Sequence, residues 1–141
     1  IYARAFLHAL DLFEKFLKVL ASLPQVPGGV ADSHRQFLDA FPDLRGVRNT
    51  AQHLEDRARG LGPGNKPLDI KPQINTATGT TGARFLALNW LLGSRYGHTM
   101  SNGEYGEIDV SHESMIKVQR ILRDVLCAFT WKGPKQHQPS A

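Results

Sequence analysis

The stretch that decides the fold reads Phe41-Pro-Asp-Leu-Arg-Gly-Val-Arg-Asn-Thr-Ala-Gln-His-Leu-Glu-Asp-Arg57. Drawn as a helix at about 100° per residue, it separates into two faces. One arc of roughly 100° is apolar, which predicts a face that packs on a core. The opposite arc of roughly 140° is dense in hydrogen-bonding and titratable groups, and we expect function there. The apolar face holds Leu44, Val47, Ala51, Leu54, Ala58 and Leu61, and the polar face holds Arg45, Arg48, Asn49, Gln52, His53 and Asp56.

Two further helices are predicted on the N-terminal side of this stretch. Apolar periodicity indicates a helix over residues 2–20, which a segment rich in proline and glycine ends. Asp32 or Ser33 is expected to cap the next helix, and Pro42 either kinks that helix or begins a new one. The helical spacing of apolar residues then resumes, and the glycine-rich segment at residues 60–64 is expected to end the helix.

Residues 66–110 change character and predict β structure. Asn102-Gly103 lies between two extended runs, which is a strong hairpin signal. Residues 84–92 are compatible with a buried strand or with a short helix. Ser111 is expected to cap a last helix. The predicted fold is mainly α, a helical bundle with a small antiparallel β-hairpin or meander inserted before the last helix.

Apolar positions recur with helical spacing in both the first and the last helix. These positions are Tyr2, Phe6, Ala9, Leu10, Phe13, Phe16, Leu17 and Leu20 in the first helix, and Met115, Val118, Leu122, Val125 and Phe129 in the last.

Length and composition are those of one globular domain. We expect a single domain over residues 1–132, with the β insertion at about 66–110 and a flexible polar tail at 133–141. The net charge of +4 and the pI of about 9.5 favour an anionic partner. No apolar run approaches the ~20 residues of a membrane span, so no membrane association is expected. The lone Cys127 is consistent with a reducing compartment, and we expect the cytoplasm.

Arg48 is followed directly by Asn49, and His53 comes five positions after the arginine. This pattern resembles that of the HEPN superfamily (higher eukaryotes and prokaryotes nucleotide-binding domains), whose hallmark is an Arg followed after four to six residues by a His. The resemblance implies a helical bundle and, for many members, a metal-independent ribonuclease that acts as a dimer in toxin or antiviral defence systems. Other members are non-catalytic. This chain departs from the common pattern in its β insertion.

The residue types fit metal-free RNA cleavage. An imidazole, with an ordinary pKa of about 6.5, can activate a 2′-hydroxyl, which assigns His53 as general base or acid. Arg48 is permanently charged and would hold the phosphate. Asn49, one turn before His53, would orient the ring or contact the phosphate. A 2′-hydroxyl nucleophile makes the reaction specific for RNA and leaves a 2′,3′-cyclic phosphate.

Three further residues of the same stretch are assigned to substrate binding: Arg45, Gln52 and Arg57. For the two arginines, ion pairs along the helix are the alternative. The histidines and the lone cysteine show no zinc-site spacing, so no metal or other cofactor is expected.

The spacing of the motif bears on oligomeric state. On one helix, Arg48 and His53 are separated by about 7.5 Å along the axis and about 140° around it. One phosphate is therefore reached more easily by two copies about a two-fold axis, which predicts a homodimer. RNA is the predicted substrate, and a toxin role implies an antitoxin protein as a further partner. The competing function is a non-catalytic module that binds RNA, a nucleotide or a protein.

Overall fold

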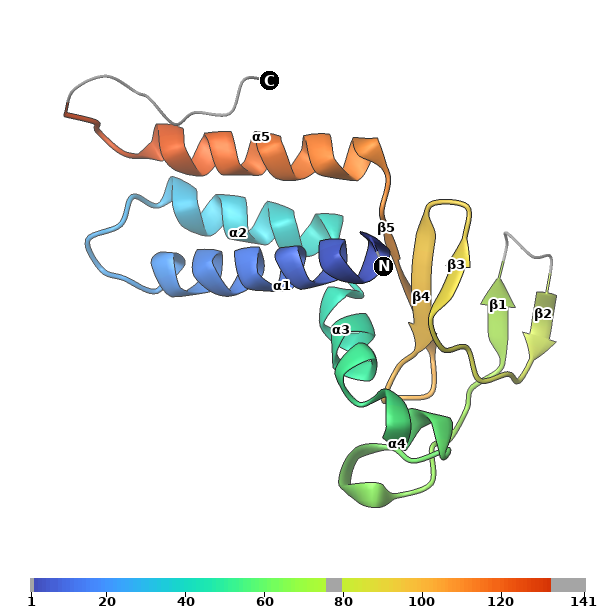
Figure 1. The fold of residues 1–141 in the computed structure, drawn as a ribbon. Helices are drawn as coiled ribbons and strands as arrows, with labels where there is room; N and C mark the ends of the chain where they lie inside the picture. Colours follow the sequence, from blue (N-terminus) through green and yellow to red (C-terminus); the bar gives the residue numbers. More distant parts are fainter. Residues whose placement is uncertain (1, 76–79, 133–141) are drawn as a thin grey trace.

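The computed structural model describes residues 2–75 and 80–132, which contain five α-helices and two small antiparallel sheets (Figure 1). The helices are α1 (Tyr2–Ala21), α2 (Gly29–Ala40), α3 (Leu44–Gln52), α4 (Leu54–Ala58) and α5 (His112–Ala128), with a 3₁₀ turn at Pro63–Asn65. The strands are β1 (Gln73–Asn75), β2 (Thr80–Ala83), β3 (Trp90–Leu92), β4 (Arg95–Thr99) and β5 (Tyr105–Asp109). The chain is mixed α/β, and its antiparallel strands precede the last helix as the sequence predicts. The predicted tail at 133–141 lies outside the described residues.

Three long helices form one layer of the molecule. α2 lies between α1 and α5 and packs against both (Figure 1). Phe37 of α2 is fully buried, and its ring lies 5.4 Å from that of Phe13 and 5.1 Å from that of Phe41. No described helix is long and apolar enough to cross a membrane. The core consists of Leu7, Leu10, Leu17, Val30, Phe37, Phe41, Leu44, Val47, Tyr96, Ile108, Ile121 and Val125.

α3 joins the helical layer to the three-stranded sheet β3-β4-β5. Leu44 and Val47, two residues of the predicted apolar face, are buried where α3 packs on α1, β4 and β5. The Thr50 hydroxyl donates to the Thr99 carbonyl at 3.2 Å, and the Asp43 carboxylate accepts the Glu107 N–H at 3.1 Å. Apolar burial and two polar bonds therefore set how α3 lies on the sheet.

The helix predicted from residue 44 through residue 59 is not continuous. α3 ends at Gln52, and His53 has φ −114° and ψ 39° before α4 begins. Arg57 is 3% exposed, whereas Ala58 of the predicted apolar face is exposed. Continued at about 100° per residue, α3 would place Arg57 at the boundary between the two faces, about 40° from both His53 and Leu61. In the structure the helix breaks at His53 and Arg57 is buried.

Two predictions about helix starts are wrong. α2 begins at Gly29, so Asp32 and Ser33 lie inside the helix and cap nothing. Val30 is fully buried against the core, and burial of its side chain favours the earlier start over a capped one. Pro42 neither kinks α2 nor starts α3, because it lies in the turn between them.

The predicted first and last helices are confirmed, but not all their apolar residues are buried. Tyr2 is 91% exposed, Phe16 is 69% exposed and Met115 is 41% exposed. The buried face of α5 is instead centred on Ser114, Ile121 and Val125.

Around the second sheet, two local predictions are confirmed. β4 and β5 pair as a hairpin, with Tyr96 opposite Ile108, and Ser111 caps α5 by accepting the Ser114 N–H at 3.2 Å. Residues 84–92 form neither predicted element over their length, since only Trp90–Leu92 pairs as a strand.

The hairpin turn requires glycine at position 103. Gly103 has φ +84°, and a Cβ there would collide with the Asp69 carbonyl oxygen. Its own carbonyl accepts the Lys71 N–H at 2.9 Å and the Gln73 side-chain amide at 3.0 Å. The turn is thus docked on the segment that leads into β1.

Replacing Gly103 is expected to lower the free energy of unfolding by much more than backbone strain alone would. Gly103→Ala should lower the free energy of unfolding by about 3 kcal/mol or more, because strain and collision add. Gly60→Ala is the matched control, since Gly60 has φ +72° and nothing within 4 Å of the added Cβ. It should cost about 1–2 kcal/mol in urea denaturation, and equal costs for the two variants would contradict the docked turn.

A buried histidine in β4 belongs to a closed hydrogen-bond ring. His98 is fully buried, and its Nδ1 accepts the Asn89 N–H at 3.1 Å. Its Nε2 therefore carries the proton and donates to the Tyr96 hydroxyl at 3.1 Å, which donates to the Asn89 side-chain oxygen at 2.7 Å. Burial, with a smaller contribution from Arg4, lowers the pKa of His98 to about 4.

Acid is expected to weaken the fold through His98. The unfolded chain takes up a proton below pH of about 6.5, and the folded chain does so only below about 4. The free energy of unfolding should therefore fall by up to about 3 kcal/mol as pH drops through this window. Denaturant titrations at stepped pH check this, and His98→Asn should lose most of the slope even though it is less stable overall. An unchanged slope in the variant would contradict the assignment.

Candidate functional site

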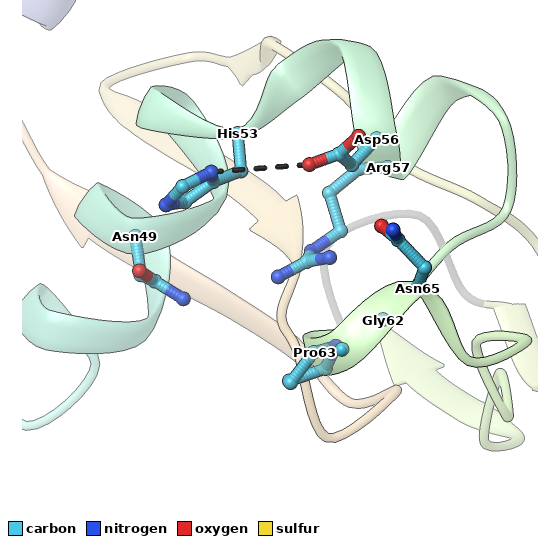
Figure 2. A pocket seen from close by; sticks show the side chains of 8 residues that line it. Asn49, His53, Asp56, Arg57, Gly62, Pro63 and Asn65 are labelled. Carbon is cyan, nitrogen blue, oxygen red and sulfur yellow. Dashed lines mark ion pairs between the residues drawn. The ribbon is translucent and has the colours of Figure 1, made fainter.

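A pocket of about 320 Å³ lies where α3 gives way to α4 (Figure 2). We call it the His53 pocket. It brings together three residues that the sequence assigns to the site, Asn49, His53 and Arg57. The full lining is Asn49, His53, Asp56, Arg57, Gly62, Pro63, Gly64 and Asn65.

His53 occupies the helix break, and its side chain is 56% exposed. Its Nδ1 lies 3.9 Å from a carboxylate oxygen of Asp56, which is ion-pair distance rather than a hydrogen bond. The other Asp56 oxygen accepts from the Arg59 guanidinium at 2.6 Å. The imidazole is thus accessible and has a carboxylate beside it.

Arg57 extends into the space between α3 and the loop that carries Pro63 and Asn65 (Figure 2). Its Nη1 donates to the Leu61 carbonyl at 2.5 Å. Its buried Nε has no hydrogen-bond partner within the part of the chain that the structure describes. A buried guanidinium with an unused donor is costly unless something polar completes it.

The far wall of the pocket comes from the glycine-rich segment. Gly64 has φ +67° and Asn65 has φ +59°, so the chain turns back toward the helices there. The glycines of this segment predict only the end of a helix. The Gly-Pro-Gly-Asn composition is nevertheless a turn signal, and it could have placed these residues opposite the helix.

Arg48 lies outside the His53 pocket. Its Nε donates to Asp11 of α1 at 2.8 Å, and its Nη1 donates to the side chain of Gln52 at 2.8 Å. Asp11 is 3% exposed and also binds Lys15 at 2.6 Å. Arg48 therefore neutralises a buried carboxylate and ties α3 to α1.

The predicted site residues are divided between the His53 pocket and a second pocket of about 390 Å³. Arg48 and Arg45 line it together with residues of α1 and α2, whereas Asn49 and His53 line the first pocket. Arg45 is exposed and has no polar partner within residues 2–75 and 80–132. One chain thus keeps the arginine and the histidine of the motif in different pockets.

No group of three or more His, Cys, Asp or Glu side chains that could hold a metal ion occurs among the described residues. Comparison with protein-family models, curated proteins and solved structures found no match to this chain.

The two halves of the motif are expected to differ in their effect on stability. Arg48→Ala should lower the free energy of unfolding by on the order of 3 kcal/mol, because the buried Asp11 loses one of its two cations. His53→Ala should change it by less than about 0.5 kcal/mol, since the side chain is exposed. Urea denaturation at pH 7 measures both. Equal losses would show that Arg48 is not a structural tie.

Proposed function

We propose that this chain is a metal-independent, HEPN-type endoribonuclease and that the His53 pocket holds the phosphodiester. The observation that carries the proposal is the gathering of an accessible imidazole, an amide and a guanidinium around one pocket. These groups supply a base, a neutral donor and a cation, the set that RNA transesterification needs.

In the proposed reaction, His53 removes the proton of the 2′-hydroxyl. The 2′ oxygen then attacks the adjacent phosphorus, and the bond from phosphorus to the 5′ oxygen breaks. The products are a 2′,3′-cyclic phosphate and a 5′-hydroxyl, whose proton comes from water or from a protonated imidazole. The Asp56 carboxylate lies 3.9 Å from the ring on the side of its Nδ1.

The phosphate would be bound by groups that are otherwise incompletely used. The unpartnered Nε makes Arg57 the cation of the pocket in place of Arg48. The Asn49 amide lines the same pocket and can donate to a non-bridging oxygen. Arg48 would act as a positioning residue that holds α3, and with it Asn49 and His53, against α1.

A homodimer remains part of this proposal. Each pocket contains one histidine, and two pockets brought together about a two-fold axis would supply one imidazole as base and the other as acid. An RNA substrate, a toxin or defence role and an antitoxin partner likewise remain predictions from the resemblance.

The second candidate is a non-catalytic RNA- or nucleotide-binding module. The pairing of Arg48 with Asp11 favours it, because this pairing removes the motif arginine from the His53 pocket. Such a module would bind RNA through Arg57 and Arg45 without cleaving it.

An RNA-cleavage assay separates the two candidates. Purified protein in excess EDTA is incubated with a labelled structured RNA, and the ends of the products are analysed. Wild type should leave 2′,3′-cyclic phosphates, and His53→Ala should be slower by on the order of 10²-fold or more because the base is lost. His8→Ala, which removes an exposed histidine of α1, should cleave at the wild-type rate.

Two outcomes would contradict the nuclease proposal. Equal cleavage by wild type and His53→Ala would identify a contaminating nuclease. Binding of the RNA by a folded wild type without cleavage would support the module instead. Cleavage should also stop when the nucleotide at the cut site carries a 2′-deoxy sugar.

A further inference from the structure

The second pocket, of about 390 Å³, lies where three helices meet, and the proposed reaction does not use it. We call it the Arg45 pocket. α1 contributes Lys15 and Lys18 to its lining, α2 contributes Leu38, and α3 contributes Arg45 and Arg48. Its volume is that of a site for a small organic molecule or for one unit of a larger chain.

The charged side chains of the Arg45 pocket leave an excess of positive charge. Four of them are cationic, namely Lys15, Lys18, Arg45 and Arg48, and two are carboxylates, Asp11 and Glu14. With His34 neutral, the lining therefore carries two more positive than negative charges. An excess of this sign favours an anionic ligand.

Both carboxylates already have partners, which leaves two of the cations unpaired. Asp11 is 3% exposed and accepts from Lys15 at 2.6 Å and from Arg48 at 2.8 Å. Glu14 accepts from His34 of α2 at 2.9 Å. Arg45 and Lys18 are exposed, and neither has a polar partner in the described part of the chain. The pocket thus offers one guanidinium and one ammonium with which a bound anion can pair.

Apolar surface lies in the same pocket as these cations. Leu38 of α2 is 43% exposed, and Pro42, in the turn before α3, is exposed as well. An inorganic anion would leave this surface in water, whereas an anion that carries a ring would cover part of it. The lining therefore fits a phosphate joined to an organic group better than it fits a phosphate alone.

The Arg45 pocket and the His53 pocket are neighbours along α3. Arg45 and Asn49 are four positions apart, about 6 Å along the helix axis, and they line different pockets. Gln52, which accepts from Arg48 at 2.8 Å, is exposed on the same helix. A strand that crosses α3 would therefore meet both pockets.

We propose that the Arg45 pocket binds a second nucleotide of the RNA, away from the bond that is cleaved. Arg45 and Lys18 pair with its phosphate, and its sugar or base covers Leu38 and Pro42. This inference deepens the proposed function and rests on RNA as its ligand, but it does not require that the RNA be cleaved. A free mononucleotide has the same chemistry, and the experiment below separates the two sources.

Binding of an RNA that cannot be cleaved tests the proposal. A short, labelled single strand with 2′-O-methyl groups throughout is titrated with protein, and fluorescence anisotropy gives the Kd. The double variant K18A/R45A should bind at least about tenfold more weakly than wild type, because its phosphate loses both charged partners. The slope of log affinity against log salt should become shallower by about 0.7, the value for one lost phosphate contact on a single strand.

A second double variant is the matched control. K117A/R120A removes the same two charges from α5, where both side chains are exposed and lie outside the Arg45 pocket. It should keep the wild-type Kd and salt slope.

Two leucines test the apolar part of the pocket. Leu38→Ser should weaken binding about threefold without changing the salt slope, because it removes apolar surface and no charge. Leu12→Ser alters a leucine of α1 with nearly the same exposure, 42% against 43%, outside the pocket, and should leave binding unchanged.

Titration calorimetry with small ligands separates the two sources of the nucleotide. Adenosine 5′-monophosphate should bind wild type more tightly than inorganic phosphate or adenosine does, because only the monophosphate fills both parts of the pocket. The RNA should bind at least about 100-fold more tightly than the monophosphate, since a strand engages both pockets at once.

Three outcomes would overturn the proposal. The first is equal binding of the RNA by wild type and K18A/R45A, both folded by circular dichroism. The second is an equal loss in K18A/R45A and K117A/R120A, which would show general attraction by charge. The third is binding of the monophosphate as tightly as the RNA, which would assign the pocket to a free nucleotide. If wild type still cleaves RNA, each of these refutes only the Arg45 pocket. Weaker binding by K18A/R45A without cleavage by wild type would refute only the nuclease.

Discussion

The bond between Asp11 and Arg48 is the constraint on which the arrangement of this molecule depends. A carboxylate that is 3% exposed would be strongly destabilising alone, and here Arg48 and Lys15 neutralise it. The pairing holds α3 against α1 on one side while Val47 and Thr50 seat it on the sheet on the other. Since α3 carries Asn49 and is followed directly by His53, the position of the candidate site follows from this bond.

The break at His53 converts a surface into a pocket. A continuous helix would spread Asn49, His53 and Arg57 along one solvated face. The break and the burial of Arg57 turn this arginine toward the loop at Gly62–Asn65. Gly64 and Asn65 have positive φ angles, and the loop forms the far wall of the pocket. A buried guanidinium with an unused donor then faces an accessible imidazole and an amide. That arrangement is suited to a phosphodiester, whose anionic oxygens would satisfy the arginine.

α1 serves two surfaces because its neighbouring residues point in different directions. Asp11 turns inward to hold α3, and Leu12, about 100° further around the helix, is exposed. The same geometry segregates charge, since the acidic side chains of α1 are paired internally and its exposed charged side chains are basic.

Local patterns in the sequence determined several features by themselves. Asn102-Gly103 determined the hairpin, because few residues tolerate its backbone angles, and Ser111 determined the start of α5. The apolar spacing of Leu44 and Val47 correctly marked a buried face. Only the tertiary structure decided that Arg48 and His53 line different pockets, that Arg57 is buried and that Phe16 is exposed. Periodicity states which side chains share a helix face, but the neighbours that pack on a face decide which face is buried. Arg48 pairs with the carboxylate of Asp11, which is 37 positions away in sequence. No local sequence pattern predicts a contact at that sequence separation.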